Sequence, residues 1–263
     1  MNSTQSPSHP HRQPPPPRRI WQELGLSGNP FRRLFDEELL ATLLDAEPET
    51  PLRTAEGWIA LANPVLQFIG QEGYGKSTRL EACHCLLRRQ ANCSTHFTYV
   101  PLGTMSVSPP IMPTPAVWLL DEAQRLNRWH RRKLVDWAQT PGCRLLIGTH
   151  EDLSAGFARR GVGCHSEELK EPGLAELQRF VRRRLTFSRR EHSGDAAIPE
   201  ITVAEDALSL VAQAMHGNLG RAEFILYEAF QHAAINAVQM GHDIRIGMEA
   251  VRIVSERAQQ VLG

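Results

Sequence analysis

The 263-residue chain lacks a long apolar run, a net charge and a paired set of cysteines. No uninterrupted apolar stretch approaches the roughly 18 residues of a membrane span, and the first residues lack the apolar core of a signal peptide. The 29 basic and 29 acidic residues balance, so no overall field draws the chain to nucleic acid or to anionic lipid. Five cysteines, an odd number, suit a reducing compartment. These absences predict a soluble, cytoplasmic protein without membrane insertion.

Lysine is scarce as well, and the chain contains only Lys76, Lys133 and Lys170. The first of them lies in Gly70–Ser77, which matches the phosphate-loop pattern G-x-x-x-x-G-K-[ST] at every fixed position. The apolar run before this loop predicts a buried strand, and the sequence after it predicts a helix. Glycines let such a loop curl so that successive N–H groups point at phosphate oxygens, beside the positive end of the helix dipole.

We therefore expect this loop to bind the phosphates of a nucleotide. The expected binding residues are Gly70, Gln71, Glu72, Gly73, Tyr74, Gly75, Lys76, Ser77 and Thr78. In this pattern the lysine reaches the terminal phosphates, and the hydroxyl of the next residue holds Mg²⁺. The side chain of Tyr74 has no assigned role at this stage.

A second chemical motif is the acidic pair Asp121-Glu122, which follows the apolar run Val117–Leu120. Ligands of a parallel sheet bind beyond the carboxyl ends of its strands, so this pair is predicted to face the phosphate loop. We expect Asp121 to hold Mg²⁺ together with Ser77, and Glu122 to polarise the attacking water as a general base. Thr149 ends the next predicted strand and is expected to position that water, a role for which we favour it over His150.

Hydrophobic spacing divides the chain into a tail and two domains. Residues 1–20, rich in Pro, Ser, His and Gln, predict a disordered tail. Strands are predicted at Val65–Ile69, His96–Leu102, Val117–Leu120, Arg144–Gly148 and Val162–His165. Helices are predicted at Ser77–Arg89, Arg125–Gln139, Asp152–Arg159, Leu174–Phe187, Ala204–Met215, Arg221–Val238 and Ile246–Val261. This order predicts an α/β class fold: a P-loop NTPase αβα sandwich with a parallel five-stranded sheet at 21–190, then a small all-helical lid domain at 191–263.

The ordered motifs resemble the AAA+ ATPases from about Leu24 to the C-terminus. Within that family the sequence looks closest to the bacterial group of the general secretion pathway ATPase component A, the transposition ATPases and the replication-initiator-like ATPases. Three further segments support the resemblance: Gly28-Asn29-Pro30-Phe31, Arg159-Arg160 and Gly217-Asn218-Leu219-Gly220-Arg221. The resemblance implies that Asn29, Pro30 and Phe31 bind the adenine, that Arg159 or Arg160 is an arginine finger acting on a neighbouring subunit, and that Arg221 senses the nucleotide from the lid.

The resemblance also implies a function. ATP and Mg²⁺ are the expected ligands, a ring or filament of identical subunits is the expected assembly, and hydrolysis is expected to remodel or regulate a client protein or a protein–DNA complex. The chain departs from the family between the second and third strands, where the proline-rich segment Thr104–Pro115 replaces a helix. A pore that grips a substrate is therefore in doubt.

Other function classes fit less well. A GTPase needs an Asn-Lys-x-Asp motif, and no lysine of this chain follows an asparagine. A nucleoside kinase does not ordinarily combine Asp-Glu with a helical lid. A slow or non-hydrolysing nucleotide-gated switch that assembles on DNA or a partner stays open as an alternative.

Two further clusters of residues give weaker evidence of a function. Arg125, Arg128 and Arg132 share one face of a predicted helix, which indicates a solvated basic face or a contact with DNA. Cys83 and Cys85 lie two apart on a predicted helix, so they point in different directions and are unsuited to one zinc ion.

Overall fold

The structure is a computed structural model of the chain. It describes residues 24, 26, 28–34, 38, 39, 42, 57, 58, 63–89, 93–190, 200–240 and 243–262. The predicted tail at 1–20 lies outside the described residues. Contacts divide the chain into two compact units. One holds Arg33–Gly173 with Gly217–Leu219, and the other holds Leu174–His216 and Gly220–Gly263 with the residues up to Arg32.

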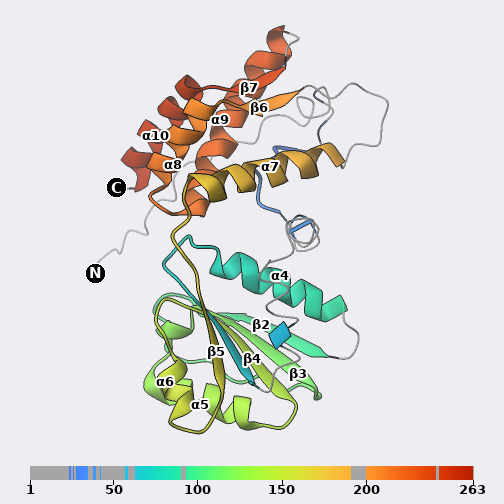
Figure 1. The fold of residues 1–263 in the computed structure, drawn as a ribbon, viewed down its shortest axis with the longest axis vertical. Helices are drawn as coiled ribbons and strands as arrows, with labels where there is room; N and C mark the ends of the chain where they lie inside the picture. Colours follow the sequence, from blue (N-terminus) through green and yellow to red (C-terminus); the bar gives the residue numbers. More distant parts are fainter. Residues whose placement is uncertain are drawn as a thin grey trace, which may run out of the picture. The chain divides into compact units, whose positions relative to one another are not determined.

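The first unit is an α/β sandwich around a five-stranded sheet (Figure 1). Its strands are β1 (Val65–Ile69), β2 (Ser94–Tyr99), β3 (Ala116–Asp121), β4 (Cys143–Thr149) and β5 (Cys164–Glu168). Its helices are α4 (Lys76–Arg89), the short 3₁₀ helix η1 (Ala123–Arg125), α5 (Arg128–Gln139) and α6 (Ser154–Ala158). All neighbouring strands are parallel, in the order β2-β3-β4-β1-β5. This confirms the predicted P-loop NTPase fold.

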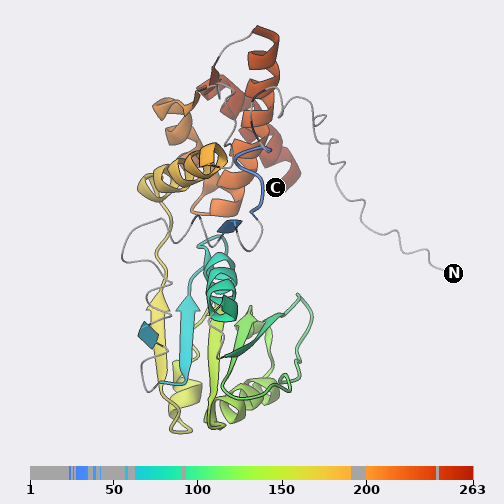
Figure 2. The same ribbon diagram turned by 90° about the vertical axis from the view of Figure 1, so that its right-hand side faces the viewer.

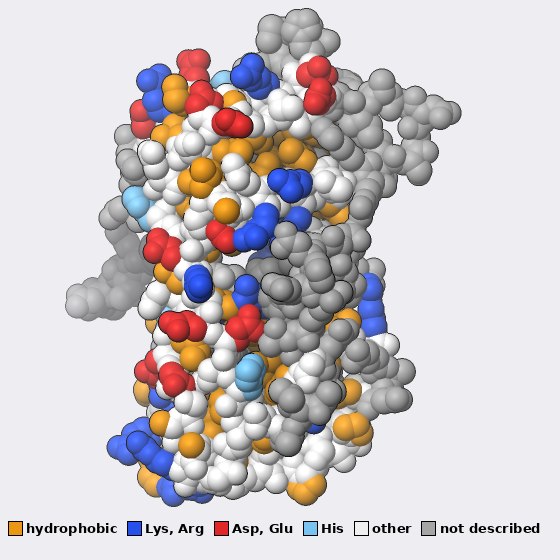
Figure 3. Space-filling view, viewed as in Figure 1, with side chains coloured by type: hydrophobic (Ala, Val, Ile, Leu, Met, Phe, Trp, Pro, Cys, Tyr) orange, Lys and Arg blue, Asp and Glu red, His pale blue; other side chains and the backbone are white. Residues whose placement is uncertain are grey.

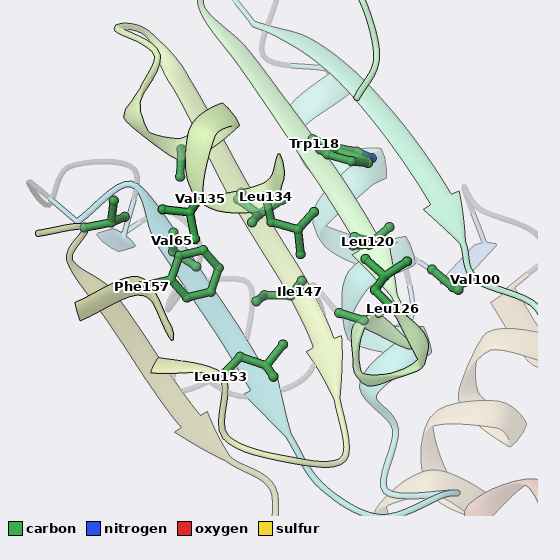
Figure 4. Close-up of a cluster of buried hydrophobic side chains, with 14 residues drawn as sticks. Val65, Val100, Trp118, Leu120, Leu126, Leu134, Val135, Ile147, Leu153 and Phe157 are labelled. Atoms are coloured by element: carbon green, nitrogen blue, oxygen red, sulfur yellow. The ribbon is translucent and has the colours of Figure 1, made fainter. Parts of the chain in front are cut away.

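Hydrophobic side chains cover both faces of this sheet, as a parallel sheet requires. On one face, α4 contributes Leu80 and Leu87 to a cluster with Leu66 and Phe68 of β1. On the other face, α5 and α6 bury a second cluster, drawn in Figure 4. The central strand β4 is buried along nearly all its length, whereas the edge strands β2 and β5 are partly exposed. The carboxyl ends of β1, β3 and β4 therefore meet at one edge of a rigid scaffold.

The observed bounds correct several sequence-based expectations. β2 ends at Tyr99 rather than Leu102, and β5 begins at Cys164 rather than Val162. α5 begins at Arg128 rather than Arg125, because the side chain of Asn127 accepts hydrogen bonds from the N–H groups of Trp129 and His130 and caps the helix. The remaining predicted strands, at Val65–Ile69, Val117–Leu120 and Arg144–Gly148, all fall within observed strands.

The buried face predicted for α5 is also partly wrong. The helical spacing of Leu126, Trp129, Leu134 and Trp137 predicts that these residues form the buried face, but the side chain of Trp129 is 71% exposed. Leu134, Val135 and Ala138 are the buried residues of the helix. A residue five positions before Leu134 points about 140° away from it in a helix of 3.6 residues per turn. Trp129 therefore faces solvent.

The second unit is helical, as predicted. It contains α7 (Leu174–Arg190), α8 (Glu205–Met215), α9 (Leu219–Met240) and α10 (Met248–Leu262). In addition, β6 (Ile201–Val203) and β7 (Ile244–Ile246) pair in parallel, so the unit is not entirely helical. The helical spacing of Leu174, Leu177, Val181 and Leu185 predicts that all four face inward, but Leu174 is 40% exposed. The contacts between α7 and α8 place α7 in this unit, which therefore begins at Leu174, before the sequence-based boundary at 190–191.

Candidate nucleotide-binding site

The phosphate loop joins the end of β1 to the start of α4. Gly70 continues the strand, because its N–H donates to the carbonyl of Thr149 at 3.1 Å. Gly73 and Gly75 adopt positive φ angles of 82° and 87°, a region that glycine enters without steric cost. The loop residues Gln71, Glu72 and Thr78 are exposed. The loop thus has the strand–loop–helix setting that binding of phosphates requires.

Lys76 is buried against this loop. Its ammonium donates to the carbonyls of Gly70 at 2.8 Å and Gln71 at 2.9 Å. Burial lowers the pKa of Lys76, and the nearby carboxylates of Glu122 and Asp121 oppose that shift. A cation held beside the loop, with its stem immobilised, is suited to phosphate oxygens.

Ser77 and Asp121 meet at the centre of the site. The Ser77 hydroxyl donates to Asp121 Oδ2 at 2.6 Å, and the Glu122 N–H donates to Asp121 Oδ1 at 3.0 Å. Burial raises the pKa of Asp121, while the hydrogen bond from Ser77 lowers it. A hydroxyl and a carboxylate are hard oxygen donors, which is the chemistry that Mg²⁺ prefers. These two side chains fit a magnesium ion that also contacts phosphate.

Gly148, which the sequence analysis did not single out, makes room for this pair. A Cβ at position 148 would lie 2.6 Å from Asp121 Oδ1 and 2.8 Å from Leu80 Cδ1. A larger residue at this position would displace the carboxylate or the end of the Leu80 side chain. The signal in the sequence is a glycine that interrupts an otherwise apolar strand.

Glu122 directly follows β3 in a left-handed conformation, with φ 62° and ψ 38°. Its Oε2 accepts hydrogen bonds from Gln124 Nε2 at 2.7 Å and pairs with Arg125 Nη2 at 2.9 Å. On the other oxygen, His150 Nε2 lies 3.4 Å from Glu122 Oε1. The carboxylate therefore has three polar neighbours, and from the sequence His150 alone of the three was weighed for a role in this site.

Arg125 had been expected on a basic helix face with Arg128 and Arg132. It lies instead in η1, where Nη1 donates to Tyr99 Oη at 3.0 Å and to the carbonyl of Val100 at 2.7 Å. Its guanidinium thus connects the acidic pair to the end of β2.

Thr149 is fully buried at the end of β4, between β3 and β1. Its hydroxyl donates to the carbonyl of Glu151 at 2.9 Å and accepts from the Glu151 N–H at 3.2 Å. The side chain lies at the expected strand end, but both hydrogen bonds are made to its own turn.

Tyr74 packs onto the core beneath the loop, where it lies against Gly70 beside Leu169. It therefore supports the loop, which explains an aromatic residue at a variable position of the motif.

The segment Gly217–Leu219 lies on the phosphate loop. The Leu219 N–H donates to the carbonyl of Gly73 at 3.1 Å, and a Cβ at Gly73 would clash with Asn218. In the sequence, only the family resemblance connects this segment with the nucleotide. Here its backbone contacts the loop directly.

The remaining predicted site residues lie elsewhere. Asn29, Pro30 and Phe31 are buried in the helical unit: Asn29 Nδ2 donates to the Tyr227 carbonyl at 2.8 Å, and the ring of Phe31 packs edge-on against Phe230 of α9. Arg221 is half-buried near the start of α9 in the same unit. Their predicted roles toward the nucleotide stay predictions.

Arg159 and Arg160 follow α6 and are exposed. On the face drawn in Figure 3, basic side chains gather at the lower left, on the side where Figure 1 draws α6. Cys164, the first residue of β5, pairs with Val65, the first residue of β1, whereas the phosphate loop follows the last residue, Ile69. The length of β1, about 15 Å at 3.3 Å per residue, separates the two ends. Neither arginine can reach the phosphate loop of its own chain.

Comparisons with known proteins identify the fold. No protein-family profile matches the chain, and no curated protein matches it by sequence. Among solved structures, the RuvB Holliday junction branch migration motor of Thermotoga maritima is 16% identical, with a TM-score of 0.52 over 78% of this chain and 68% of that one. Cdc6p from Pyrobaculum aerophilum is 14% identical, with a TM-score of 0.53 over 90% and 70%. Domain III of the Thermotoga maritima replication initiation protein DnaA is 13% identical, with a TM-score of 0.53 over 85% and 97%.

At these identities the likeness shows the fold alone, that of a P-loop NTPase, and membership of the AAA+ ATPases stays a prediction. The narrower grouping with secretion and transposition ATPases stays a prediction, because these neighbours carry other descriptions. In the described part of the chain, no helix is both long and apolar enough to cross a membrane.

Proposed function

We propose that this chain is an ATP hydrolase that uses Mg²⁺ at the phosphate loop. The observation that carries the proposal is the 2.6 Å hydrogen bond between Ser77 and Asp121, which unites two motifs that lie 44 residues apart. A loop alone is a common turn, and an acidic pair alone is a common strand end. Their meeting beside a buried lysine supports a site for a metal-bound triphosphate.

Each side chain of the site has a chemical part in this proposal. The loop N–H groups and Lys76 bind the phosphates, and Ser77 and Asp121 hold the magnesium ion. When bound, Mg²⁺ neutralises charge on the phosphate oxygens. Glu122 accepts a proton from the attacking water, and Thr149 orients that water. For this, Thr149 must exchange one hydrogen bond with Glu151 for one with water.

We further propose that the site is completed by a neighbouring copy of the chain. Arg159 and Arg160 are too far from their own phosphate loop, so a role in hydrolysis requires them to act in trans. Of the two, we favour Arg159. Arg160 Nη1 lies 3.9 Å from Asp136, whereas Arg159, among the described residues, has no ion pair and stays available to a phosphate. A ring or filament of identical subunits satisfies this requirement.

The finer proposals rest on the resemblance and on the fold neighbours. Arg221 senses the nucleotide in cis, and Asn29, Pro30 and Phe31 bind the adenine. The printed descriptions of the fold neighbours include a Holliday junction motor and a replication initiation protein, which supports DNA as a partner beside a client protein. A regulator of the transposition or secretion type is consistent with the sequence motifs. All five cysteines are free, which supports a cytoplasmic location.

A second candidate is a nucleotide-gated switch that hydrolyses slowly or not at all. The observation that favours it is the set of contacts around Glu122. Gln124 and Arg125 both occupy Oε2, so that oxygen must release one of them before it can accept a hydrogen bond from an attacking water. In this case, ATP binding would drive assembly without rapid turnover.

Two variants test the proposals together. In Lys76→Ala, we expect both ATP binding and hydrolysis to be lost, whereas Lys170→Ala, a change at an exposed lysine, leaves both intact. In Glu122→Gln, we expect ATP binding to persist while turnover falls about 10²–10⁴-fold, the usual contribution of a general base. Binding of a fluorescent ATP analogue and release of phosphate are measured at rising protein concentration.

The outcomes separate the two candidates. Wild-type turnover in Lys76→Ala would remove the site from the mechanism altogether. A wild-type chain that binds ATP but shows no turnover sensitive to Glu122→Gln would favour the switch. Specific activity that climbs with protein concentration supports a site shared between copies.

A further inference from the structure

Two exposed aromatic side chains of the α/β unit each lie against an arginine. Tyr99 ends β2 and is 54% exposed, with Arg125 Cζ 5.6 Å from its ring centroid. Trp129 lies in the first turn of α5 and is 71% exposed, with Arg132 Cζ 5.6 Å from its ring centroid. The other described phenylalanine, tyrosine and tryptophan side chains of this unit are buried or half-buried, so the exposure of these two requires an explanation.

Backbone contacts connect the two pairs. The proline-rich connection after Tyr99 runs beside the sheet (green in Figure 2), and the carbonyl of Met105 in it accepts a hydrogen bond from the Asn127 N–H at 3.2 Å. Asn127 in turn caps the helix turn that carries Trp129. We call this the Trp129 surface, and it consists of Tyr99, Met105, Arg125, Arg128, Trp129 and Arg132.

The Trp129 surface is strongly basic in a chain without net charge. The first two turns of α5 carry Arg128, Arg131, Arg132 and Lys133, and the first turn has no acidic residue. Cations at this end of a helix oppose the helix dipole and lower its stability. Arg131 pairs with Glu151 and donates to the carbonyls of Leu126 and Gln124, whereas Arg128 and Arg132 are exposed and make no ion pair among the described residues. These two charges and the exposed indole indicate a ligand that is anionic and offers flat apolar faces.

We propose that the Trp129 surface binds single-stranded DNA. Unpaired bases stack on the rings of Trp129 and Tyr99, and Arg128 and Arg132 contact the phosphates between them. In duplex DNA the bases stack on one another and offer no free face, so an exposed indole gives no advantage there. The proposal rests on the DNA partner proposed above and names the surface and the form of DNA that it takes.

The test measures the binding of a fluorescein-labelled oligo-dT of about 20 nucleotides by anisotropy. Trp129→Ala should weaken binding about 5- to 150-fold, the loss expected for one stacked base, and Trp129→Phe should restore most of it. Replacing Arg128 and Arg132 together by alanine should reduce the slope of log K against log salt by about 1.4, since each phosphate contact on a single strand contributes about 0.7. Arg125 is left unchanged because it also contacts Glu122.

Matched controls lie away from the surface. Phe224→Ala removes another exposed aromatic ring, on α9, and Arg88→Ala with Arg89→Ala removes two exposed cations at the end of α4. The aromatic control should bind the oligonucleotide like the wild type, and the charge control should keep its salt slope. Thermal unfolding checks that every variant is folded, which we expect because Trp129, Arg128 and Arg132 are exposed.

Three results would overturn the inference. The wild type could fail to bind oligo-dT at about 50 mM salt, Trp129→Ala could bind oligo-dT with unchanged affinity, or the surface could bind a polyglutamate peptide and not DNA. A duplex of the same length should bind more weakly and be insensitive to Trp129→Ala. ATP turnover is measured on the same samples. If the wild type shows no ATP turnover but binds oligo-dT through Trp129, the proposed hydrolase alone is wrong. If it turns over ATP but its oligo-dT binding does not depend on Trp129, this inference alone is wrong.

Discussion

Two charged regions of the α/β unit differ in how their side chains are held. At the phosphate loop, Lys76, Asp121 and Glu122 are all more than nine-tenths buried, and each has at least two polar neighbours at short distance. Around α5 and α6, Arg128, Arg132 and Arg159 are exposed, and the described residues offer them few partners. The first region is already organised in one copy of the chain, whereas the second is open to partners from outside.

This difference has a physical origin. A buried charge is costly unless opposite charges and hydrogen bonds surround it, so the phosphate loop tolerates only a fixed arrangement. An exposed guanidinium keeps its hydration, which costs little, and loses it only when a better partner arrives. The buried region therefore sets the chemistry in cis, and the exposed arginines are suited to contacts in trans.

The largest effect is expected at the exposed end of α6. In Arg159→Ala, turnover should fall about 10³-fold or more, because a finger arginine neutralises charge on the transferring phosphoryl group. Mixing Arg159→Ala with Lys76→Ala should restore part of the activity, since a Lys76→Ala copy still offers Arg159 to its neighbour. Phosphate release from the mixture measures this.

The matched change, Arg160→Ala, should have a smaller effect, because Arg160 already lies near Asp136. Wild-type turnover in Arg159→Ala, or a mixture no more active than its two components, would contradict the contrast between the regions.

The sequence predicts the buried region better than the exposed one, because buried strands have a strong local hydrophobic signal and exposed segments do not. The loop motif and the apolar runs of β1, β3 and β4 have strong local signals, because these strands are buried on both faces. β5 reads Cys-His-Ser-Glu-Glu, an exposed edge strand whose polar residues carry no periodic signal, so it was placed too early. The ion pair between Arg125 and Glu122 depends on where η1 ends, which local propensity does not specify.

Gly148 offers a test of how tightly the buried region is packed. In Gly148→Ala the new Cβ would lie 2.6 Å from Asp121 Oδ1 and 2.8 Å from Leu80 Cδ1, so both side chains must shift. We expect the free energy of unfolding to fall by about 1–3 kcal/mol, as in other overpacked cores, together with weaker Mg²⁺-dependent ATP binding. Denaturant unfolding and titration with a fluorescent ATP analogue measure the two effects.

The matched control is Gly156→Ala in α6, where a Cβ meets nothing within 4 Å. Since alanine is favoured over glycine inside a helix, this variant should gain about 0.5–1 kcal/mol. Equal stability of the two variants would mean that the buried region can relax, and the contrast with the exposed region would disappear.

The smallest effect is expected at Asn127, which fixes the start of α5 and with it the exposed Trp129. Its Oδ1 accepts from the N–H groups of Trp129 at 3.1 Å and His130 at 3.0 Å. Asn127→Ala should cost about 1 kcal/mol of unfolding free energy through loss of the helix cap, and Asn127→Asp should keep the cap and add a favourable charge beside the basic first turn. If the Trp129 surface needs an ordered helix start, oligo-dT binding should weaken in Asn127→Ala although no contacting side chain has changed. Unchanged stability and affinity in that variant would show that the exposed region tolerates fraying, and that its organisation arises only when a partner binds.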